Sequence, residues 1–329
     1  MGREDRLERY LRRWENTGLL RAPRHRSSPA VTSITMPELP EVETIRAALD
    51  PELAGATVIE AWGHPSAKFA QAPAAIGRRF VSVGRRGKYL LADLSSPPDP
   101  HGAQRRTPHT ELGPPADSQL VVHLGMTGVL SLRPSRTPGT SHMPPEGDHV
   151  RAWWALDDRR TLVFSDVRRF GRLAVVAHGD YSGLPTLAAL GPEPFDPMFS
   201  PSLLRAGVNA TSRTIKTALL SQRIVAGLGN IYVDESLWRA RIDPRRRTGL
   251  GRQRAEALHG AIVDVLAEAV DEGGTTLRDY RMLDGSSGEH QHRLEVYGRA
   301  GLPCLRCGST LRSTVVDART TVWCGSCQR

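Results

Sequence analysis

Two kinds of hydrophobic spacing divide the chain after residue 36 into a β-patterned part and a helical part. Between residues 57 and 177, short apolar or alternating runs are separated by turn signals such as Asp157-Asp158, as is typical of strands joined by hairpins. The runs cover residues 57–61, 80–83, 89–94, 120–124, 150–156, 161–165 and 172–176. Seven short strands predict a β-sandwich. Two proline-rich inserts, 95–118 and 134–148, interrupt it, and we expect both to be exposed.

A helix is predicted just ahead of this β region. Val42, Ile45, Ala48 and Leu49 form one apolar face at helical spacing. Pro40 suits the first helical position, and Glu41 and Glu43 fall in the first turn, where the helix dipole favours an anion.

Met36, Pro37 and Glu38 precede this helix and suggest a nucleophile. Methionine followed by proline is a typical site of methionine removal, which would leave Pro37 with a free secondary amine beside the Glu38 carboxylate. An α-amine titrates at about pH 7.7–8.0, so part of it is an unprotonated nucleophile at neutral pH. Attack of such an amine on C1′ of a sugar gives a cationic iminium, which suits cleavage of a glycosidic bond and then of the strand. Taken alone, the same three residues fit an ordinary helix start.

Three polar clusters stand where predicted strands end. Their sequences are RRGKY at residues 85–89, HLGMTG at 123–128 and DVRRFG at 166–171. Together they offer cations for phosphate and two apolar side chains, Met126 and Phe170, of the kind that unstack a duplex step. Each cluster alone fits a solvated loop as well.

From residue 201 to residue 272 the apolar positions follow helical spacing on three successive faces. These faces are Ile215, Leu219 and Leu220; Ile231, Leu237, Trp238 and Ile242; and Leu258, Ile262, Val265, Leu266 and Ala269. Gly273-Gly274 is expected to end the last helix. Residues 227–230, GLGN, predict a turn whose backbone N–H groups grip a phosphate, with Asn230 as a further donor. An ordinary turn between helices fits the same spacing.

The four cysteines form two Cys-x2-Cys pairs, Cys304 with Cys307 and Cys324 with Cys327, separated by sixteen residues. This spacing predicts one tetrahedral zinc site, and four thiolates leave no open position, so the metal would be structural. An iron site of the same spacing is the alternative. Arg319 lies between the pairs, where it could reach a ligand.

Charge and composition narrow the class of partner. The chain has 329 residues, a formal net charge of +9 and a sequence pI near 9.9, which favours a polyanion. No apolar run approaches the length of a membrane span, so no membrane partner is expected. With all four cysteines near the C-terminus, nothing is left for a disulfide framework, which indicates a reducing compartment.

Residues 1–35 differ from the rest of the chain. They are rich in arginine and contain an amphipathic stretch around residues 6–20, followed by a polar tail. Four acidic residues argue against an organelle transit peptide. We expect an upstream translation start, absent from the working protein, which would begin at Pro37 after removal of Met36.

These pieces, in this order, resemble the formamidopyrimidine-DNA glycosylase family of base-excision repair enzymes. The motifs that carry the resemblance are PELPEVET, RRGKYLL, HLGMTG, DHV, RRFG, LGPEPF, VAGLGNIYVDESLW, GGTTLRDY, VYGR and the four-cysteine ribbon. The resemblance implies an α+β multidomain protein. Its parts would be an extension (1–35), a β-sandwich with an N-terminal helix (36–190), a helix–two-turn–helix domain (196–285) and a zinc ribbon (294–329).

The resemblance also implies roles for individual residues. Pro37 would be the Schiff-base nucleophile and Glu38 the acid/base residue, while Lys88 and Arg319 would donate protons in β- and δ-elimination. Met126, Arg168 and Phe170 would fill the space of the everted nucleotide, and His123, His149, Lys216 and Asn230 would hold phosphates. A loop over the extruded base would include Gly274, Thr275, Thr276, Arg278 and Tyr280. Cys304, Cys307, Cys324 and Cys327 would bind one structural Zn²⁺.

We therefore expect an enzyme that binds damaged double-stranded DNA, removes oxidised purines such as 8-oxoguanine and formamidopyrimidines, and nicks the abasic site. It is expected to be a monomer, of bacterial type, in the cytoplasm and associated with the nucleoid. An endonuclease VIII-like enzyme for oxidised pyrimidines is an alternative, although that class usually begins PEGPE. A non-catalytic zinc-ribbon DNA-binding protein is another, if residues 1–35 are retained. Val167 replaces the proline common before the Arg-Arg-Phe triplet, and we expect little effect.

Overall fold

The computed structural model describes residues 36–96, 116–134, 149–247, 249–275 and 288–329. The described residues form two compact units, one before and one after the boundary between Leu190 and Gly191. The N-terminal extension and most of both proline-rich inserts lie outside the described residues. Among the helices that are described, none is long and apolar enough to cross a membrane.

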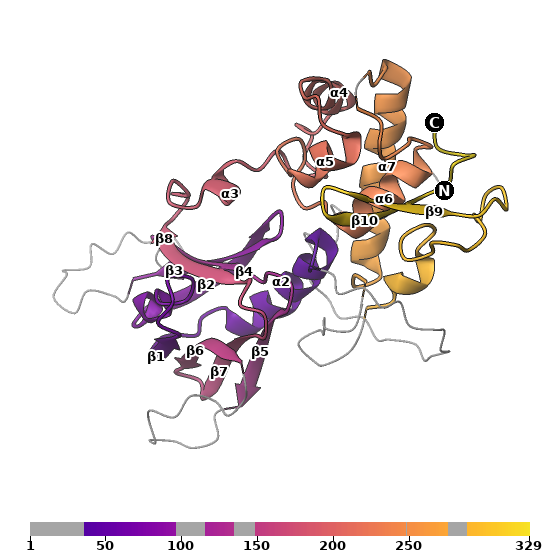
Figure 1. Cartoon of the computed structure of the whole chain (residues 1–329). Helices are drawn as coiled ribbons and strands as arrows, with labels where there is room; N and C mark the ends of the chain where they lie inside the picture. Colours follow the sequence, from indigo (N-terminus) through magenta and orange to yellow (C-terminus); the bar gives the residue numbers. More distant parts are fainter. Residues whose placement is uncertain (1–35, 97–115, 135–148, 248, 276–287) are drawn as a thin grey trace. The chain divides into compact units, whose positions relative to one another are not determined.

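The first unit contains two four-stranded antiparallel sheets with strand orders β1-β6-β7-β5 and β2-β3-β4-β8 (Figure 1). The strands are β1 (Val58–Gly63), β2 (Arg79–Arg86), β3 (Tyr89–Ser95), β4 (Ser118–His123), β5 (Gly128–Pro134), β6 (Val150–Leu156), β7 (Arg160–Asp166) and β8 (Arg172–Ala177). A short 3-10 helix, η1 (Ala72–Ala75), and a one-turn helix, α3 (Pro185–Ala188), complete this unit.

All seven predicted strands are present, and β5 is one that the pattern missed. It begins at Gly128 and ends at Pro134, two residues that argue against a strand in the interior of a sheet. Because β5 pairs only with β7, at the edge of its sheet, Pro134 removes no ladder hydrogen bond that a second neighbour would need.

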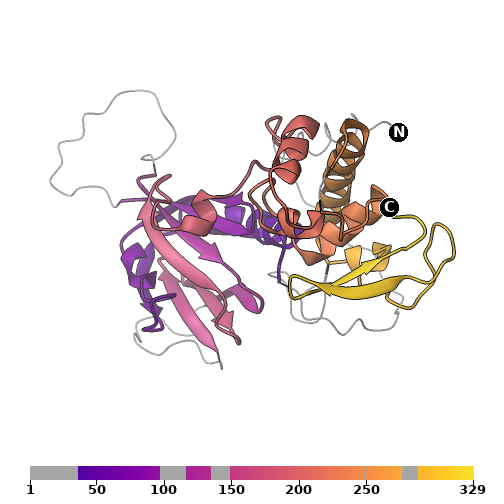
Figure 2. The same ribbon diagram turned by 45° about the horizontal axis from the view of Figure 1, so that its top comes forward.

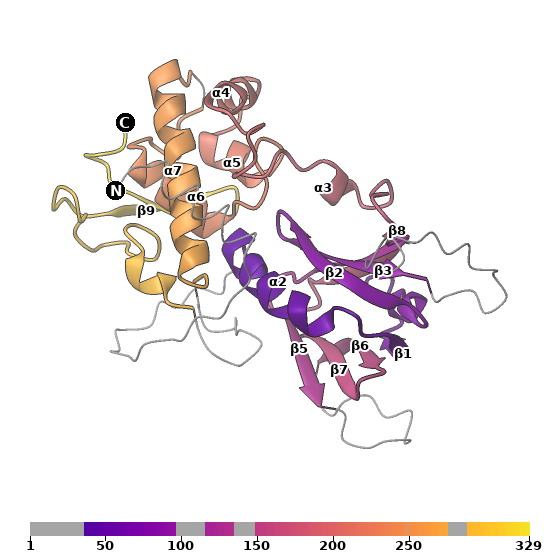
Figure 3. The same cartoon turned by 180° about the vertical axis from the view of Figure 1, so that it is seen from behind.

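One hydrophobic core joins both sheets and the helix α2 (Leu39–Leu53). Of the predicted apolar face, Val42, Ile45 and Leu49 are buried in it, whereas Ala48 is only partly buried. Trp154 and Phe164 are fully buried in the same core, and the indole of Trp154 donates to the Ala72 carbonyl at 3.1 Å. Figure 3 shows α2 running beside β2, against which it packs.

The second unit begins with a helical part. Its helices are α4 (Pro201–Asn209), α5 (Ile215–Leu220), α6 (Asn230–Arg239) and α7 (Arg252–Asp271), followed by a 3-10 turn, η2 (His290–Arg293). As predicted, α7 ends just before Gly273-Gly274: both glycines have positive φ, and Gly274 N–H donates to the Ala269 carbonyl at 2.8 Å.

A two-stranded hairpin of β9 (Arg312–Val316) and β10 (Arg319–Trp323) lies beside α6 in this unit (Figure 2). Trp238, expected on a helix–helix face, instead packs into the small core of the ribbon with Val296, Leu311 and Val322. The predicted face of α6 therefore serves two cores, since Ile231 and Leu237 belong to the helical one.

Candidate functional site

The segment that carries the predicted nucleophile is held at the start of α2. Pro37 is buried, and Glu38 is only 2% exposed. The Glu38 N–H donates to the Glu41 carboxylate at 2.8 Å, and the Glu38 side chain accepts a hydrogen bond from the first helical turn, so the two form a capping box. The helix begins at Leu39, one residue earlier than Pro40 had suggested, and Glu38 is its N-cap. Of the two glutamates expected in the first turn, only Glu41 lies there, because the earlier start moves Glu43 beyond it.

Lys88 lies in the two-residue turn between β2 and β3, after Gly87, whose φ is +56°. It is 3% exposed, so the predicted proton donor is a buried cation. The preceding Arg85 joins this turn to α2: its guanidinium bonds the Glu43 carboxylate at 2.8 Å and the Gly87 carbonyl at 3.0 Å. Arg85 and Glu43 are both buried, so this ion pair fixes the turn against the helix that begins after Pro37 and Glu38.

His123 ends β4 and faces the ring of Tyr89, with 4.7 Å between ring centroids. Burial lowers the pKa of His123 to about 4, and the positive charges of Lys88 and Arg172 act in the same direction. Gly125 N–H lies 3.2 Å from Nδ1, which must therefore be the acceptor, so the ring is neutral and carries its proton on Nε2. The predicted phosphate ligand would thus act as a neutral donor.

We expect the imidazole of His123 to titrate near pH 4 in the folded protein, against about 6.5 in an unfolded chain. Since the folded-state value is the lower one, the unfolded chain binds the proton first. The stability that neutral His123 contributes is present above about pH 6.5 and is lost as the pH falls towards 4. NMR titration of the ring protons, assigned with His123→Gln, measures this midpoint. A midpoint near 6.5 would contradict the buried environment of the His123 ring.

Met126, Arg168 and Phe170 lie on two loops of the first unit, residues 124–127 and 167–171. Met126 is partly buried, whereas Phe170 is 47% exposed and stacks under the Arg168 guanidinium at 4.8 Å. His149, also predicted to hold phosphate, is exposed with φ of +77°, and its carbonyl accepts from Asp166 N–H at 2.9 Å.

Lys216, predicted as a phosphate ligand, is fully buried in the second unit. Its ammonium bonds the Asp234 carboxylate at 2.7 Å and the Thr320 carbonyl at 3.2 Å. Asn230 also donates to the Thr320 carbonyl, at 3.1 Å, and Asp234 accepts from Val322 N–H at 3.1 Å. These contacts anchor β10 to α5 and α6. A phosphate contact by Lys216 would require its ammonium to become accessible.

Glu235, next to Asp234 on α6, was not singled out in the sequence. Its carboxylate accepts from the backbone N–H groups of Glu295, Val296 and Tyr297 at 2.8 to 3.1 Å. Burial raises the pKa of Glu235 to about 7, although these hydrogen bonds favour the charged form and act in the opposite direction. Glu235 therefore fixes the segment that leads from η2 into the ribbon.

The predicted base-covering loop is described only at its first two residues, Gly274 and Thr275. Thr275 is 2% exposed, with its hydroxyl 3.0 Å from that of Tyr232, and the Gly274 carbonyl accepts from His290 N–H at 3.2 Å. His290 in turn lies 2.8 Å from the Glu272 carboxylate. Thr276, Arg278 and Tyr280 lie outside the described residues.

Arg319 is the exposed first residue of β10. It follows Asp317 and Ala318, both with positive φ, which is the geometry of a two-residue hairpin turn. The carbonyl of the next residue, Thr320, is the one held by Lys216 and Asn230, so the strand that presents Arg319 is anchored at its start.

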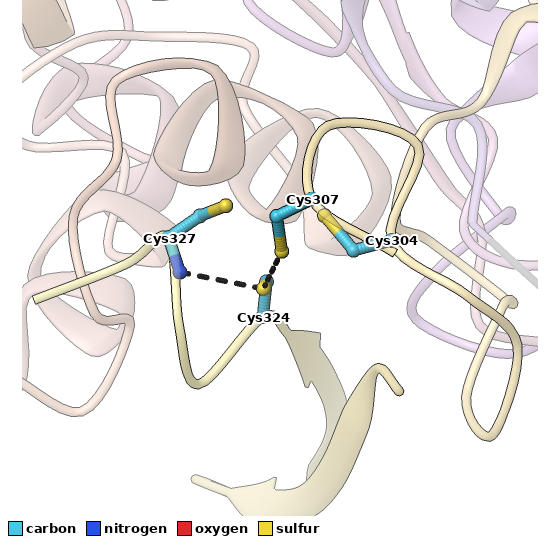
Figure 4. Close-up of side chains that lie close together, drawn as sticks. All are labelled: Cys304, Cys307, Cys324 and Cys327. Atoms are coloured by element: carbon cyan, nitrogen blue, oxygen red, sulfur yellow. Dashed lines mark hydrogen bonds between the residues drawn. The ribbon is translucent and has the colours of Figure 1, made fainter. Parts of the chain in front are cut away.

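The sulfur atoms of Cys304, Cys307, Cys324 and Cys327 all lie within 4.8 Å of one another (Figure 4). A tetrahedral site with Zn–S bonds of about 2.3 Å places its sulfurs about 3.8 Å apart, so the cluster has the size that zinc requires. The Cys307 and Cys324 sulfurs are 3.5 Å apart. With four thiolates present, no position is left for a reacting water.

Models of known families match most of the chain. Residues 36–173 match the formamidopyrimidine-DNA glycosylase N-terminal domain, residues 190–281 the H2TH domain of the same enzymes, and residues 301–329 a zinc finger found in FPG and IleRS. The formamidopyrimidine-DNA glycosylase of Deinococcus radiodurans is 42% identical over 297 residues, which cover 89% of this chain and 97% of that protein. The chain belongs to the formamidopyrimidine-DNA glycosylase family. The enzyme of Thermus thermophilus is 43% identical, with 89% and 98% covered.

Solved structures of the formamidopyrimidine-DNA glycosylase family also match this chain. The crystal structure of MutM (Fpg) from Thermus thermophilus matches with a TM-score of 0.75 at 42% identity, covering 89% of this chain and 98% of that one. A mutant of the Lactococcus lactis Fpg, in complex with Fapy-dG-containing DNA, matches with a TM-score of 0.74 at 31% identity, covering 89% and 100%. These matches and the four-cysteine cluster confirm the predicted fold class and the structural zinc.

Proposed function

We propose that this protein is a base-excision repair glycosylase that removes oxidised purines, including 8-oxoguanine and formamidopyrimidines, from duplex DNA and then nicks the abasic site. One observation carries the proposal: the chain spans 97% of a formamidopyrimidine-DNA glycosylase with which it shares 42% identity. Two structural relatives are bound to Fapy-dG-containing DNA and to carbocyclic 8-oxo-G-containing DNA. The net charge of +9 suits a polyanionic partner.

In the proposed first step the Pro37 nitrogen, as a free amine, attacks C1′ of the damaged nucleotide. A bond forms between that nitrogen and C1′, and the nitrogen gives up its proton. The C1′–base bond breaks with its electron pair leaving on the base, which takes up a proton. Opening of the sugar then breaks the C1′–O4′ bond, O4′ takes a proton, and an iminium remains. Glu38, adjacent to the nucleophile and held by the capping box, is the proposed acid/base residue.

Strand cleavage follows from the positive charge on that iminium. Loss of a C2′ proton and departure of the 3′-phosphate is β-elimination, for which Lys88 is the proposed proton donor. Loss of a C4′ proton and departure of the 5′-phosphate is δ-elimination, for which Arg319 is the proposed proton donor. The buried position of Lys88, in a turn fixed by Arg85, supports a defined orientation for its ammonium.

The remaining assignments concern DNA. Phosphates would be held by His123, His149, Lys216 and Asn230, and the closing loop would contain Gly274, Thr275, Thr276, Arg278 and Tyr280. Met126, Arg168 and Phe170, called the wedge below, would fill the gap left by the everted nucleotide, because a base inside a duplex must leave the stack before an enzyme can act on it. Phosphate contacts fix register without reading sequence, as a search for rare lesions requires.

A single chain carries every proposed residue, so we propose that the protein acts as a monomer on the nucleoid DNA of a bacterial-type cell. The proposed domain boundaries are 36–190, 196–285 and 294–329.

Single-turnover assays on matched duplexes test the substrate class. We expect excision of 8-oxoguanine and of a formamidopyrimidine to exceed excision of an oxidised pyrimidine by at least about tenfold, a difference of about 1.4 kcal/mol in transition-state free energy. An undamaged duplex is the control. The reverse preference would support the endonuclease VIII-like alternative. Binding of DNA without excision, by protein that retains residues 1–35, would support the non-catalytic one.

A further inference from the structure

A single buried carboxylate ties together the two loops that carry the wedge. Asp166, the last residue of β7, is 0% exposed. Its Oδ1 accepts from the Thr127 hydroxyl at 2.6 Å, and its Oδ2 accepts from the Gly171 N–H at 2.7 Å. One of these donors belongs to each loop, so neither loop can shift alone without breaking a charge-assisted hydrogen bond.

The Thr127 hydroxyl extends this connection. While it donates to Asp166, it accepts the N–H of Arg168 at 3.0 Å. The loop that carries Phe170 is therefore held near its start through Arg168 and at its end through Gly171. The residue that holds its start, Thr127, directly follows Met126.

The backbones of the two loops also touch. A Cβ atom added to Gly125, whose φ is +68°, would lie 2.4 Å from the Gly171 nitrogen and 2.5 Å from the Phe170 carbonyl carbon. Only glycine permits this approach, since both the space and the backbone conformation exclude a side chain. The pair of loops thus behaves as one packed element.

A buried arginine also holds Asp166, through its backbone. The Arg151 guanidinium, on the neighbouring strand β6, donates to the Asp166 backbone carbonyl at 2.8 Å, and the residue is 6% exposed. A buried carboxylate is costly unless it is paired and hydrogen-bonded, so this arrangement is better suited to fixing a geometry than to adding stability. By contrast, Phe170 is 47% exposed, so the position of its ring depends on how firmly its loop is held.

We infer that Thr127 and Asp166 are positioning residues that hold Met126, Arg168 and Phe170 as one rigid wedge, so that the two loops enter a duplex together. The inference rests on the proposed function, because it assigns these side chains to the gap left by an everted nucleotide. A pre-ordered wedge loses less conformational entropy on insertion than two independent loops, which favours eversion.

The test compares Thr127→Val, which removes only the hydroxyl, with Thr127→Ser, which keeps it. A duplex with 8-oxoguanine and an adjacent 2-aminopurine reports wedge insertion as a rise in fluorescence, without any need for bond cleavage. For Thr127→Val we expect insertion and single-turnover excision both to slow about tenfold, as loss of a hydrogen bond to a charged group implies. Thr127→Ser should stay within about twofold of the parent, and Asp166→Asn should resemble Thr127→Val.

Two further variants make the result specific. Ser82→Ala removes a similar hydroxyl-to-carboxylate bond, 2.8 Å to Asp93, away from these loops, and should leave insertion and excision unchanged. Met126→Ala shows how far insertion and excision fall when part of the wedge itself is missing. Normal insertion and excision by a folded Thr127→Val protein would overturn the inference. A parent protein that inserts its wedge but does not excise would contradict only the proposed function.

Discussion

Replacing Cys324 with serine is expected to abolish zinc binding, DNA binding and activity together. Cys324 is fully buried directly after β10, and its sulfur is 3.5 Å from that of Cys307. Zinc binding of this kind contributes on the order of 10 kcal/mol to the folding of the segment that it organises. Without zinc, the ends of the hairpin that presents Arg319 are no longer held together. The metal itself takes part in no chemical step, because four thiolate ligands exclude a zinc-bound hydroxide.

The measurement combines the zinc content of the purified variant with duplex affinity and excision rate. Ser326→Ala is the matched control: Ser326 lies between Cys324 and Cys327, is exposed, and its hydroxyl bonds that of Ser309 at 3.0 Å. It should retain zinc and activity. A zinc-free Cys324→Ser protein with normal binding and turnover would refute the structural role of the metal.

The second large effect concerns the residues before Pro37. Protein that retains them is expected to show no turnover, because an amide nitrogen has given its lone pair to resonance and cannot attack C1′. The burial of Pro37 adds a spatial reason, since an attached segment must leave from a buried position. Residues 1–35 carry eight arginines and four acids, so they could even raise non-specific DNA affinity while blocking chemistry.

Two preparations, one beginning at Met1 and one at Pro37, measure this effect once intact mass has verified each N-terminus. Both should bind duplex DNA, so binding controls for folding. Only the short form should release the oxidised base. Equal single-turnover rates would show that the Pro37 amine is dispensable.

Local patterns in the sequence were sufficient to predict most elements of the fold. The apolar faces of α2 and α7, the glycines after α7 and the cysteine spacing each depend on neighbours in the chain, and each was predicted correctly. Strand β5 was missed because Gly128 and Pro134 are tolerated there only through its position at a sheet edge, which is a property of the assembled sheet.

Buried polar contacts were harder to predict, because their partners are distant in sequence. Lys216 was assigned to phosphate on the strength of a resemblance, and the bonds of its ammonium to Asp234 and to the carbonyl of Thr320 were not predicted. Asp166 was noted only as part of a polar turn, although it joins two loops. A buried acid at the end of a strand gives no signal for its partner until the strands are paired.

The role of the Pro37 amine as nucleophile is tested most directly by identifying the protein atom that becomes attached to DNA. The protein beginning at Pro37 is mixed with an 8-oxoguanine duplex and borohydride, and the trapped complex is digested and mapped by mass spectrometry. A reduced sugar remnant is expected on the Pro37 nitrogen and on no other residue. A remnant on the amine of Lys88 or of any other lysine would contradict the assignment of Pro37 as the nucleophile.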